Sequence, residues 1–388
     1  QKVLWEFTDA DDAALGHVMA APQILKLAVQ QGQTQVYQWF AAVASGVNNY
    51  QSDEHSSSSG EPVLFLLDLA HNGETAWVEG QDYYKIHLKL AEGTSQAAGL
   101  LNFVAQLGNQ GETRMIYAAD LHGQLWRLDF RAQALPTLPG GNQLPLFIAR
   151  ASDGTRQPIS AAPQLLRAGN NETIVAFGSG KYMETKDSQD SQQQSFYALL
   201  DSLDDAEDGD SGSIISSTRL TRATLQADAS LEAQDFRWGR QSQWNESQGI
   251  YAGWTFDFPA YSERQVSSGV LYGSQLLVNS LIPVTNDSDA CGDGSANSYQ
   301  IDLGQGRAIY TPSSIGLLAT PAIVDVGTAR YTARDSVGQR VKTVASRAIQ
   351  PGSSGISLDT ALEQSVRVGR LSWRHIVNYQ QLHLKARP

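Results

Sequence analysis

The sequence is poor in cysteine and contains no long apolar segment. Its single cysteine, Cys291, has no partner for an internal disulfide, and no cysteine cluster could bind zinc or an iron–sulfur centre. The seven histidines are scattered, and no pair has the helical spacing of a zinc site. No apolar run reaches the roughly 18 residues of a membrane-spanning helix, so the sequence predicts no transmembrane segment.

Positive charge is also scarce. The chain has 28 Lys and Arg residues against 40 Asp and Glu residues, which gives a net charge of −12 at pH 7. No basic run interleaved with aromatic residues occurs, so the electrostatic footprint of a nucleic-acid-binding protein is missing. An acidic surface disfavours adhesion to anionic lipid and keeps a large domain soluble.

Catalytic signatures are missing as well. The sequence has no Gly-x-Ser-x-Gly nucleophile elbow and no convincing spacing of a catalytic triad. We therefore predict a protein that is not an enzyme and that requires no cofactor.

A short phrase recurs along the chain, at Ala21–Leu25, Ala162–Leu166 and Thr320–Val324. The first two copies are followed by an apolar run that ends in small residues and then by a second phrase that ends in aspartate. The apolar runs are Phe40–Gly46 and Ile174–Gly180, and the second phrases are Val63–Asp68 and Ser195–Asp201. Three strands joined by turns, the last ending in aspartate, are typical of one blade of a propeller, and such a repeat buries its faces against its neighbours.

The composition favours the same all-β fold. Most apolar runs are short and bounded by Gly, Asn, Asp, Ser or Pro, and the 34 glycines suit many tight turns. We predict that residues 1–388 form a single β-propeller domain with seven irregular blades of roughly 55 residues each and long inserted loops. Fewer than seven clean repeats are visible, so the blade count is inferred from the length.

Several individual elements are expected. Val63–Trp77 reads as a hairpin with Asn72-Gly73 at its tip, since this dipeptide favours a tight turn. Further expectations are a strand at Lys2–Phe7, short helices near Leu231–Trp238 and at Asp359–Arg367, a strand pair at Leu317–Val326 and a closing amphipathic segment around Trp373–Leu384.

The sharpest local motif lies at residues 116–130. Asp120 can accept hydrogen bonds from the turn backbone, and Gly123 can adopt the left-handed conformation. Trp126 is large enough to wedge between neighbouring blades. Asp68, Gly73 and Trp77 are expected to have the same three roles in the segment Val63–Trp77. We interpret both groups of residues as structural, with the aspartate forming the turn and the tryptophan packing between blades.

The chain also resembles a known family. The residues that carry the resemblance are Leu4–Asp9, Tyr117–Asp129, Pro163–Gln164, Phe177–Glu184, Phe196–Tyr197, Gly253–Trp254, Asp257–Pro259, Glu263–Arg264, Ser280–Pro283 and Gly369–Arg374. In this order they resemble the C-terminal β-propeller domain of the type IV pilus tip proteins, the PilY/PilC adhesin family.

The resemblance implies a function and a location. It implies the C-terminal part of a larger exported protein that supports pilus assembly, opposes retraction and mediates surface attachment. The implied partners are minor pilins or the pilus tip complex and a host or surface ligand, at the pilus tip or outer-membrane surface of a Gram-negative bacterium. Loops on one face would carry the contacts. The candidate loops are Gln51–Gly60, Pro136–Pro145, Asp201–Ser213 and Val284–Ser298.

Calcium is the point at which the sequence departs from the family. The resemblance implies an Asp-rich calcium loop just before the tyrosine strand, but Leu107–Met115 offers one carboxylate, Glu112, beside the cation Arg114. Because calcium takes about six to eight oxygen ligands, we expect no tight site there. A second acidic run is either a solvated loop or a weak calcium site, and its carboxylates are Asp204, Asp205, Glu207, Asp208 and Asp210.

Two other functions remain as alternatives. Val63–Trp77 also resembles the repeat of quinone-dependent dehydrogenase propellers, although the chain has no vicinal cysteine pair. The second alternative is a scaffold propeller unrelated to pili.

Overall fold

The computed structural model describes residues 3–47, 55–91, 98–139, 144–169, 172–203, 212–228, 230–284, 294–325, 330–334 and 340–367. The chain divides into two compact units, one formed by Gln1–Pro321 with Pro351–Gly355 and the other by Ala322–Gln350 with Ile356–Pro388. Within the described residues the structure is all-β, with helical turns confined to four short 3₁₀ segments, which confirms the predicted fold class.

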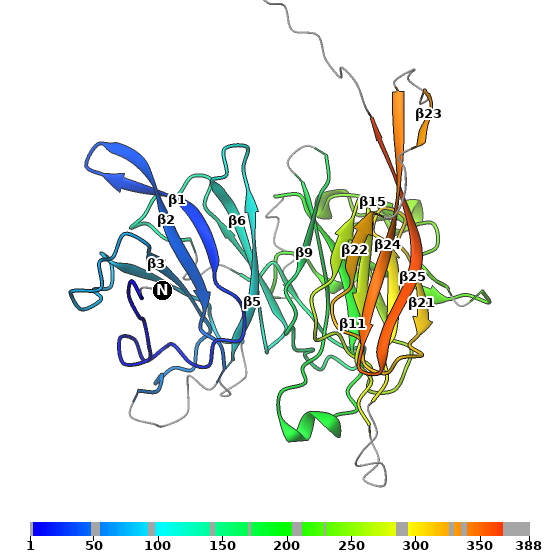
Figure 1. Ribbon diagram of the computed structural model, residues 1–388, viewed down its shortest axis with the longest axis horizontal. Coiled ribbons are helices and arrows are strands. Elements are labelled where there is room, and N and C mark those ends of the chain that lie inside the picture. Colours follow the sequence, from blue (N-terminus) through cyan, green and yellow to red (C-terminus); the bar gives the residue numbers. More distant parts are fainter. Residues whose placement is uncertain are drawn as a thin grey trace, which may run out of the picture. The chain divides into compact units, whose positions relative to one another are not determined.

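The first sheet is an antiparallel meander of four strands, drawn in blue in Figure 1. Its strands are β1 (Gln23–Gln31), β2 (Thr34–Ala44), β3 (Val63–Asp68) and β4 (Tyr83–His87). The recurring phrase therefore opens the first strand, the apolar run forms the second half of the second strand, and the phrase ending in aspartate forms the third. The second sheet repeats the meander with β5 (Leu100–Leu107), β6 (Thr113–Asp120), β7 (Gln124–Asp129) and β8 (Phe147–Ile148).

The third sheet begins with the second copy of the phrase. It contains β9 (Gln164–Arg167), β10 (Thr173–Gly178), β11 (Ser195–Asp201), β17 (Gly253–Asp257) and, parallel to β17, β12 (Leu220–Arg222). The 3₁₀ turn η1 (Thr185–Ser188) lies between β10 and β11. Between β12 and β17 lie β15 (Arg237–Trp238), β16 (Ile250–Tyr251), η3 (Gln241–Gln243) and η4 (Glu246–Gln248), and η2 (Ser217–Arg219) precedes β12.

The fourth sheet has six strands. They are β13 (Thr224–Leu225), β14 (Ser230–Glu232), β18 (Val270–Tyr272), β19 (Gln275–Asn279), β20 (Asn297–Asp302) and β21 (Arg307–Pro312). The second unit holds its own sheet, which starts with the third copy of the phrase. Its strands are β22 (Ala322–Asp325), β23 (Arg330–Arg334), β24 (Arg340–Gly352) and β25 (Gly355–Arg367).

Successive sheets of the first unit share apolar cores. Along β10, Ile174 and Ala176 enter a cluster with the fourth sheet, whereas Val175 and Phe177 enter a cluster with the second sheet. The side chains of a strand alternate between its two faces, so each face of the third sheet is buried against a different neighbour. This double burial explains why the central strands read as continuous apolar runs instead of alternating polar and apolar residues.

The outer face of the first sheet is covered differently. Phe65 and Leu67 belong to a cluster against which Trp5 and Phe7 pack. Residues 3–7 were expected to be strand, and this expectation is wrong because the described part of the segment forms no strand and contributes aromatic side chains instead.

Three other local expectations are also wrong. Residues 231–238 contain β14 and β15 instead of a helix, because Leu231 pairs with Ala308 of β21. Residues 359–367 belong to β25, which pairs with β24. The strand β3 forms its hairpin with β4, so Asn72-Gly73 lies in the connection and not at a hairpin tip. Non-local backbone pairing outweighed local propensity in each case.

The segment at residues 317–326 holds one strand, β22, and a single bridge between Leu318 and Gly352 instead of a strand pair. The expected closing segment at residues 373–384 lies outside the described residues.

The shared cores predict how truncations affect stability. Leu66 is fully buried between the first and second sheets, whereas Ile24, on the same sheet, is 54% exposed. We expect Leu66→Ala to lower the free energy of unfolding by about 2–5 kcal/mol. Ile24→Ala should change it by less than about 0.5 kcal/mol. Denaturant unfolding measures both, and equal losses would contradict the assignment of the core.

Candidate functional site

Asp120 organises the turn between β6 and β7. Its carboxylate is fully buried and accepts hydrogen bonds from the backbone N–H groups of His122 and Gln124, both at 2.9 Å. The Gln124 amide at 2.8 Å and the Trp126 indole N–H at 3.2 Å donate to its second oxygen. Burial raises the pKa of the Asp120 carboxyl, and these donors oppose that rise. All of these donors come from the turn and the strand β7 that follows it, so Asp120 is built into the fold.

Gly123 and Trp126 extend the same motif. Gly123 has a φ of +74°, and a Cβ there would lie 2.5 Å from the carbonyl oxygen of Gln157. Only glycine avoids both the strain and the clash. The Trp126 ring lies in the cluster shared by the first and second sheets, on the face of β7 opposite to Leu125.

Asp68, Gly73 and Trp77 do not form a second copy of this turn. The Asp68 carboxylate accepts a hydrogen bond from the Ala70 N–H at 2.9 Å. The Trp77 indole donates to the carbonyl of Glu6 at 2.7 Å, and its ring packs edge-on against Phe7. A Cβ on Gly73 would lie 2.4 Å from the Leu4 carbonyl oxygen. The connection between β3 and β4 therefore holds the N-terminal segment against the first sheet.

Asp201 joins the second and third sheets. It ends β11 and accepts hydrogen bonds from the Tyr117 hydroxyl at 2.7 Å and the Arg127 guanidinium at 2.8 Å. All three side chains are buried, and burial raises the pKa of the Tyr117 hydroxyl well above its usual value. The sequence pattern marked the terminal aspartate, but its partners lie more than seventy positions away along the chain.

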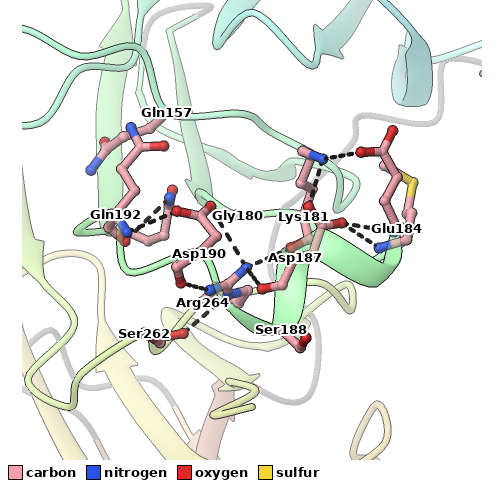
Figure 2. Close-up of polar contacts among 12 residues, drawn as sticks. Gln157, Gly180, Lys181, Glu184, Asp187, Ser188, Asp190, Gln192, Ser262 and Arg264 are labelled. Atoms are coloured by element: carbon pink, nitrogen blue, oxygen red, sulfur yellow. Dashed lines mark hydrogen bonds and ion pairs between the residues drawn. The ribbon is translucent and has the colours of Figure 1, made fainter. Parts of the chain in front are cut away.

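Arg264 lies at the centre of an extended polar cluster, shown in Figure 2. Its side chain is fully buried, and its guanidinium donates to the carbonyls of Ser262 and Lys181 at 3.0 Å. Further bonds reach the carbonyls of Asp187 at 3.0 Å and Asp190 at 2.6 Å. Burial lowers the pKa of Arg264 from its usual value. The planar fork of arginine suits this task because it satisfies several fixed acceptors at once.

The loop that surrounds Arg264 is held by a second buried charge. The Asp187 carboxylate accepts hydrogen bonds from the Lys181 ammonium at 2.6 Å and from the Met183 N–H at 2.7 Å. Burial alone would raise the pKa of Asp187, but these donors outweigh it and hold the pKa below its usual value. Gly180, with a φ of +129°, leaves room for Arg264, because a Cβ there would lie 2.4 Å from the Cβ of Arg264.

Glu263 points into a different network. One carboxylate oxygen accepts hydrogen bonds from Ser280 at 2.5 Å, Asn297 at 2.9 Å and Tyr299 at 2.6 Å. The other accepts the Ala260 N–H at 2.9 Å. Burial and the negative charge of Glu263 raise the pKa of Tyr299 far above its usual value. Adjacent residues 263 and 264 thus fix β19 and β20 on one side and the loop after β10 on the other.

Sequence reasoning singled out Glu263-Arg264 and the Lys181 to Glu184 segment, but it assigned them no contacts. Asp187 and Asp190 were missed altogether. The only local signal was the Gly-Ser-Gly run at residues 178–180, where the small residues make room for the buried side chains of Gln265 and Arg264.

The loop expected at the family's calcium position has no calcium-like donor set. Its one carboxylate, Glu112, accepts a hydrogen bond from the Gln110 N–H at 2.9 Å. The Lys26 ammonium donates to the Gln110 carbonyl at 3.3 Å, so a protein cation already neighbours the loop. Backbone hydrogen bonds, with help from Arg114 and Lys26, lower the pKa of Glu112. These residues do not fit a calcium ion, which needs several carboxylate and carbonyl oxygens.

Other candidate segments are described only in part. The acidic residues of the run at 204–210 lie outside the described residues, as do residues 51–54, 140–143, 204–211 and 285–293 of the four candidate loops. Among the residues that are described, no group of three or more His, Cys, Asp or Glu side chains could hold a metal ion.

Comparison with known proteins decides the family. The family model of the PilY1 beta-propeller domain matches residues 8–237, which is more than half of the chain. The chain belongs to the PilY1 β-propeller family. This match confirms both the resemblance and the propeller architecture. The number of blades stays a prediction.

Relatives in this family are pilus proteins. A type IV pilus biogenesis factor PilY1 homolog of Xylella fastidiosa is 30% identical over 194 residues, which cover 48% of this chain and 12% of that protein. The PilY1 biogenesis factor of Pseudomonas aeruginosa is 27% identical over 397 residues, covering 92% of this chain and 31% of that protein. The chain thus spans less than a third of the length of either relative.

A solved structure shows the same fold. The crystal structure of the Pseudomonas aeruginosa PilY1 C-terminal domain aligns with a TM-score of 0.58 at 19% identity, over 94% of this chain and 76% of that one.

Among the residues described here, no helix is long and apolar enough to cross a bilayer.

The Arg264 cluster generates a stability prediction. Arg264→Met leaves buried carbonyls without donors, so we expect the free energy of unfolding to fall by at least about 2 kcal/mol. The control is Arg307→Met, since the Arg307 side chain is 40% exposed and pairs with Asp228 at the surface. Its effect should stay within about 1 kcal/mol.

Hydrogen exchange gives the local readout for this prediction. Amides at residues 181–190 should exchange faster in Arg264→Met than in the parent chain, because the loop loses its central donor. Unchanged protection of this loop would show that Arg264 does not hold it.

Proposed function

We propose that the chain is the non-enzymatic binding and assembly module of a type IV pilus biogenesis factor. The observation that carries this proposal is the match to the PilY1 β-propeller family over residues 8–237. The named relatives are type IV pilus biogenesis factors. A place at the pilus tip or outer-membrane surface, with minor pilins or the tip complex as partners, follows from the same proposal.

The buried charges support a role in binding instead of catalysis. A general acid or base must exchange a proton with a substrate, so it needs access and a free hydrogen-bonding position. The carboxylates of Asp120, Asp187, Asp201 and Glu263 are at most 3% exposed and accept several hydrogen bonds from the protein. These groups rigidify a scaffold, and surface loops on such a scaffold would carry the contacts.

We also propose two specific roles within pilus biogenesis: the chain opposes pilus retraction, and it mediates attachment to a surface. Both need a module on the pilus that withstands load. Polar links buried between adjacent sheets, such as Asp201 with Tyr117 and Arg127, support mechanical cohesion of that kind.

A genetic experiment tests the proposed function. We expect deletion of the gene to abolish surface pili and attachment, and we expect loss of the retraction motor to restore pili in part. Complementation with Arg307→Met should restore piliation, whereas Arg264→Met should restore less of it because the scaffold is weakened. Normal pilus number and normal attachment in the deletion strain would refute the proposal. A bound quinone in the absorbance spectrum would favour the enzyme alternative.

We further propose that the loop at residues 107–115 works without calcium. The thermal unfolding midpoint should be the same in calcium and in a chelator, because Glu112 is engaged by the loop backbone and Lys26 supplies positive charge. A calcium-dependent rise that disappears in Glu112→Gln would contradict this. A rise that survives Glu112→Gln but disappears when the carboxylates of residues 204–210 become amides would assign calcium to the acidic run.

A further inference from the structure

Arginine side chains gather in a pocket at the ends of β5, β6 and β9. The pocket has a volume of about 130 Å³ and is lined by Arg114, Arg131 and Arg167, together with Gln106 and Glu172. Such a concentration of positive charge is unexpected in a chain with a net charge of −12. All of these residues belong to the first compact unit.

The charges of this pocket are only partly compensated. Asp129 forms an ion pair with Arg131. Glu172 is the one carboxylate among the described residues that line this pocket, and it forms an ion pair with Arg240 at 2.9 Å. Arg167 donates to the carbonyl of Leu107 at 2.6 Å and forms no ion pair with any residue that the structure describes. Arg114 has no side-chain hydrogen bond or ion pair within the described part of the chain, although the nearby charge of Glu112 attracts it. The pocket therefore carries a net positive charge.

A second pocket adjoins the first. Its volume is about 260 Å³, and it shares Arg114 and Arg131 with the first pocket. Tyr37, Gln35, Gln133 and the Glu112 carboxylate line the remainder, together with Ala28, Thr113 and Phe130. The Tyr37 side chain is 49% exposed, and the Lys26 ammonium lies 5.0 Å from its ring centroid. The two pockets share Arg114 and Arg131, and we call the pair the arginine groove; one end is cationic, and the other has an aromatic ring, amides and the Glu112 carboxylate.

We propose that this groove binds an acidic saccharide. Guanidinium groups bind carboxylate or sulfate oxygens through paired, charge-assisted hydrogen bonds. An exposed tyrosine ring can pack against the apolar face of a sugar, and glutamine amides can bond its hydroxyls. The anionic group would lie among Arg114, Arg131 and Arg167, with a neighbouring sugar ring against Tyr37. An acidic saccharide would be the surface ligand in the attachment that we propose above. Only this biological role rests on the proposed function, because the binding itself is argued from the groove.

Calorimetric titration of the 388-residue chain tests the proposal. The probes are a uronate-containing disaccharide, a sulfated disaccharide, inorganic sulfate and a neutral disaccharide. We expect saturable binding of both acidic disaccharides that weakens as salt is added, and much weaker binding of the neutral one. Arg114→Gln should weaken binding by at least about tenfold. Tyr37→Ala should weaken disaccharide binding while leaving sulfate binding unchanged.

Arg237→Gln is the matched control, because Arg237 is exposed and lines neither pocket. It should bind like the parent chain, and all variants should keep the parent's thermal midpoint. The proposal is overturned if Arg114→Gln binds as well as Arg237→Gln, or if the neutral disaccharide binds as well as the acidic ones. It is also overturned if inorganic sulfate accounts for all the affinity. Each of these results leaves the pilus experiment unaffected, so the two proposals fail separately.

Discussion

The structure depends on the burial of both faces of each central sheet against the next sheet along the chain. On β10, neighbouring residues such as Val175 and Ile174 enter different cores, and β6 and β7 behave in the same way. A single sheet with apolar residues on both faces cannot bury those faces by itself, so it needs a neighbouring sheet on each side. Each sheet of the first unit is therefore stabilised by its neighbours, and apolar residues must occupy both faces of its central strands.

Apolar contact of this kind does not by itself fix how one sheet sits on the next. Buried polar groups supply that specificity. Asp201 bridges the second and third sheets through Tyr117 and Arg127. Glu263 binds donors and Arg264 binds acceptors on opposite sides of a single chain segment. Because an unsatisfied buried charge is costly, a shifted arrangement that breaks these bonds is strongly disfavoured.

The surface shows the complementary behaviour. Side chains at strand ends are not packed between two sheets. The arginine groove lies at such ends, those of β5, β6 and β9. The loop at the position where the resemblance implies calcium also lies at these strand ends, but here Lys26 donates to its Gln110 carbonyl and Arg114 lies near its single carboxylate. Side-chain cations such as Lys26 and Arg114 therefore lie at the strand ends where the family resemblance implied a bound metal cation.

The sequence alone determined the features that depend on near neighbours. The recurring phrase located the first strands β1, β9 and β22, and the Asp120 to Gly123 spacing located the turn between β6 and β7. The family could also be identified, because its motifs keep their order along the chain. Local periodicity was misleading at residues 231–238 and 359–367, and Asn72-Gly73 was wrongly placed at a hairpin tip.

Only the tertiary structure decided the strand partners, the Arg264 cluster and the arginine groove. Lys181 and Arg264 lie 83 positions apart, and Arg114 and Arg167 meet through the ends of different sheets. A turn is encoded by residues that are already adjacent, whereas a strand accepts any partner with a matching backbone. Which partner it takes is settled when the apolar faces of whole sheets are buried together.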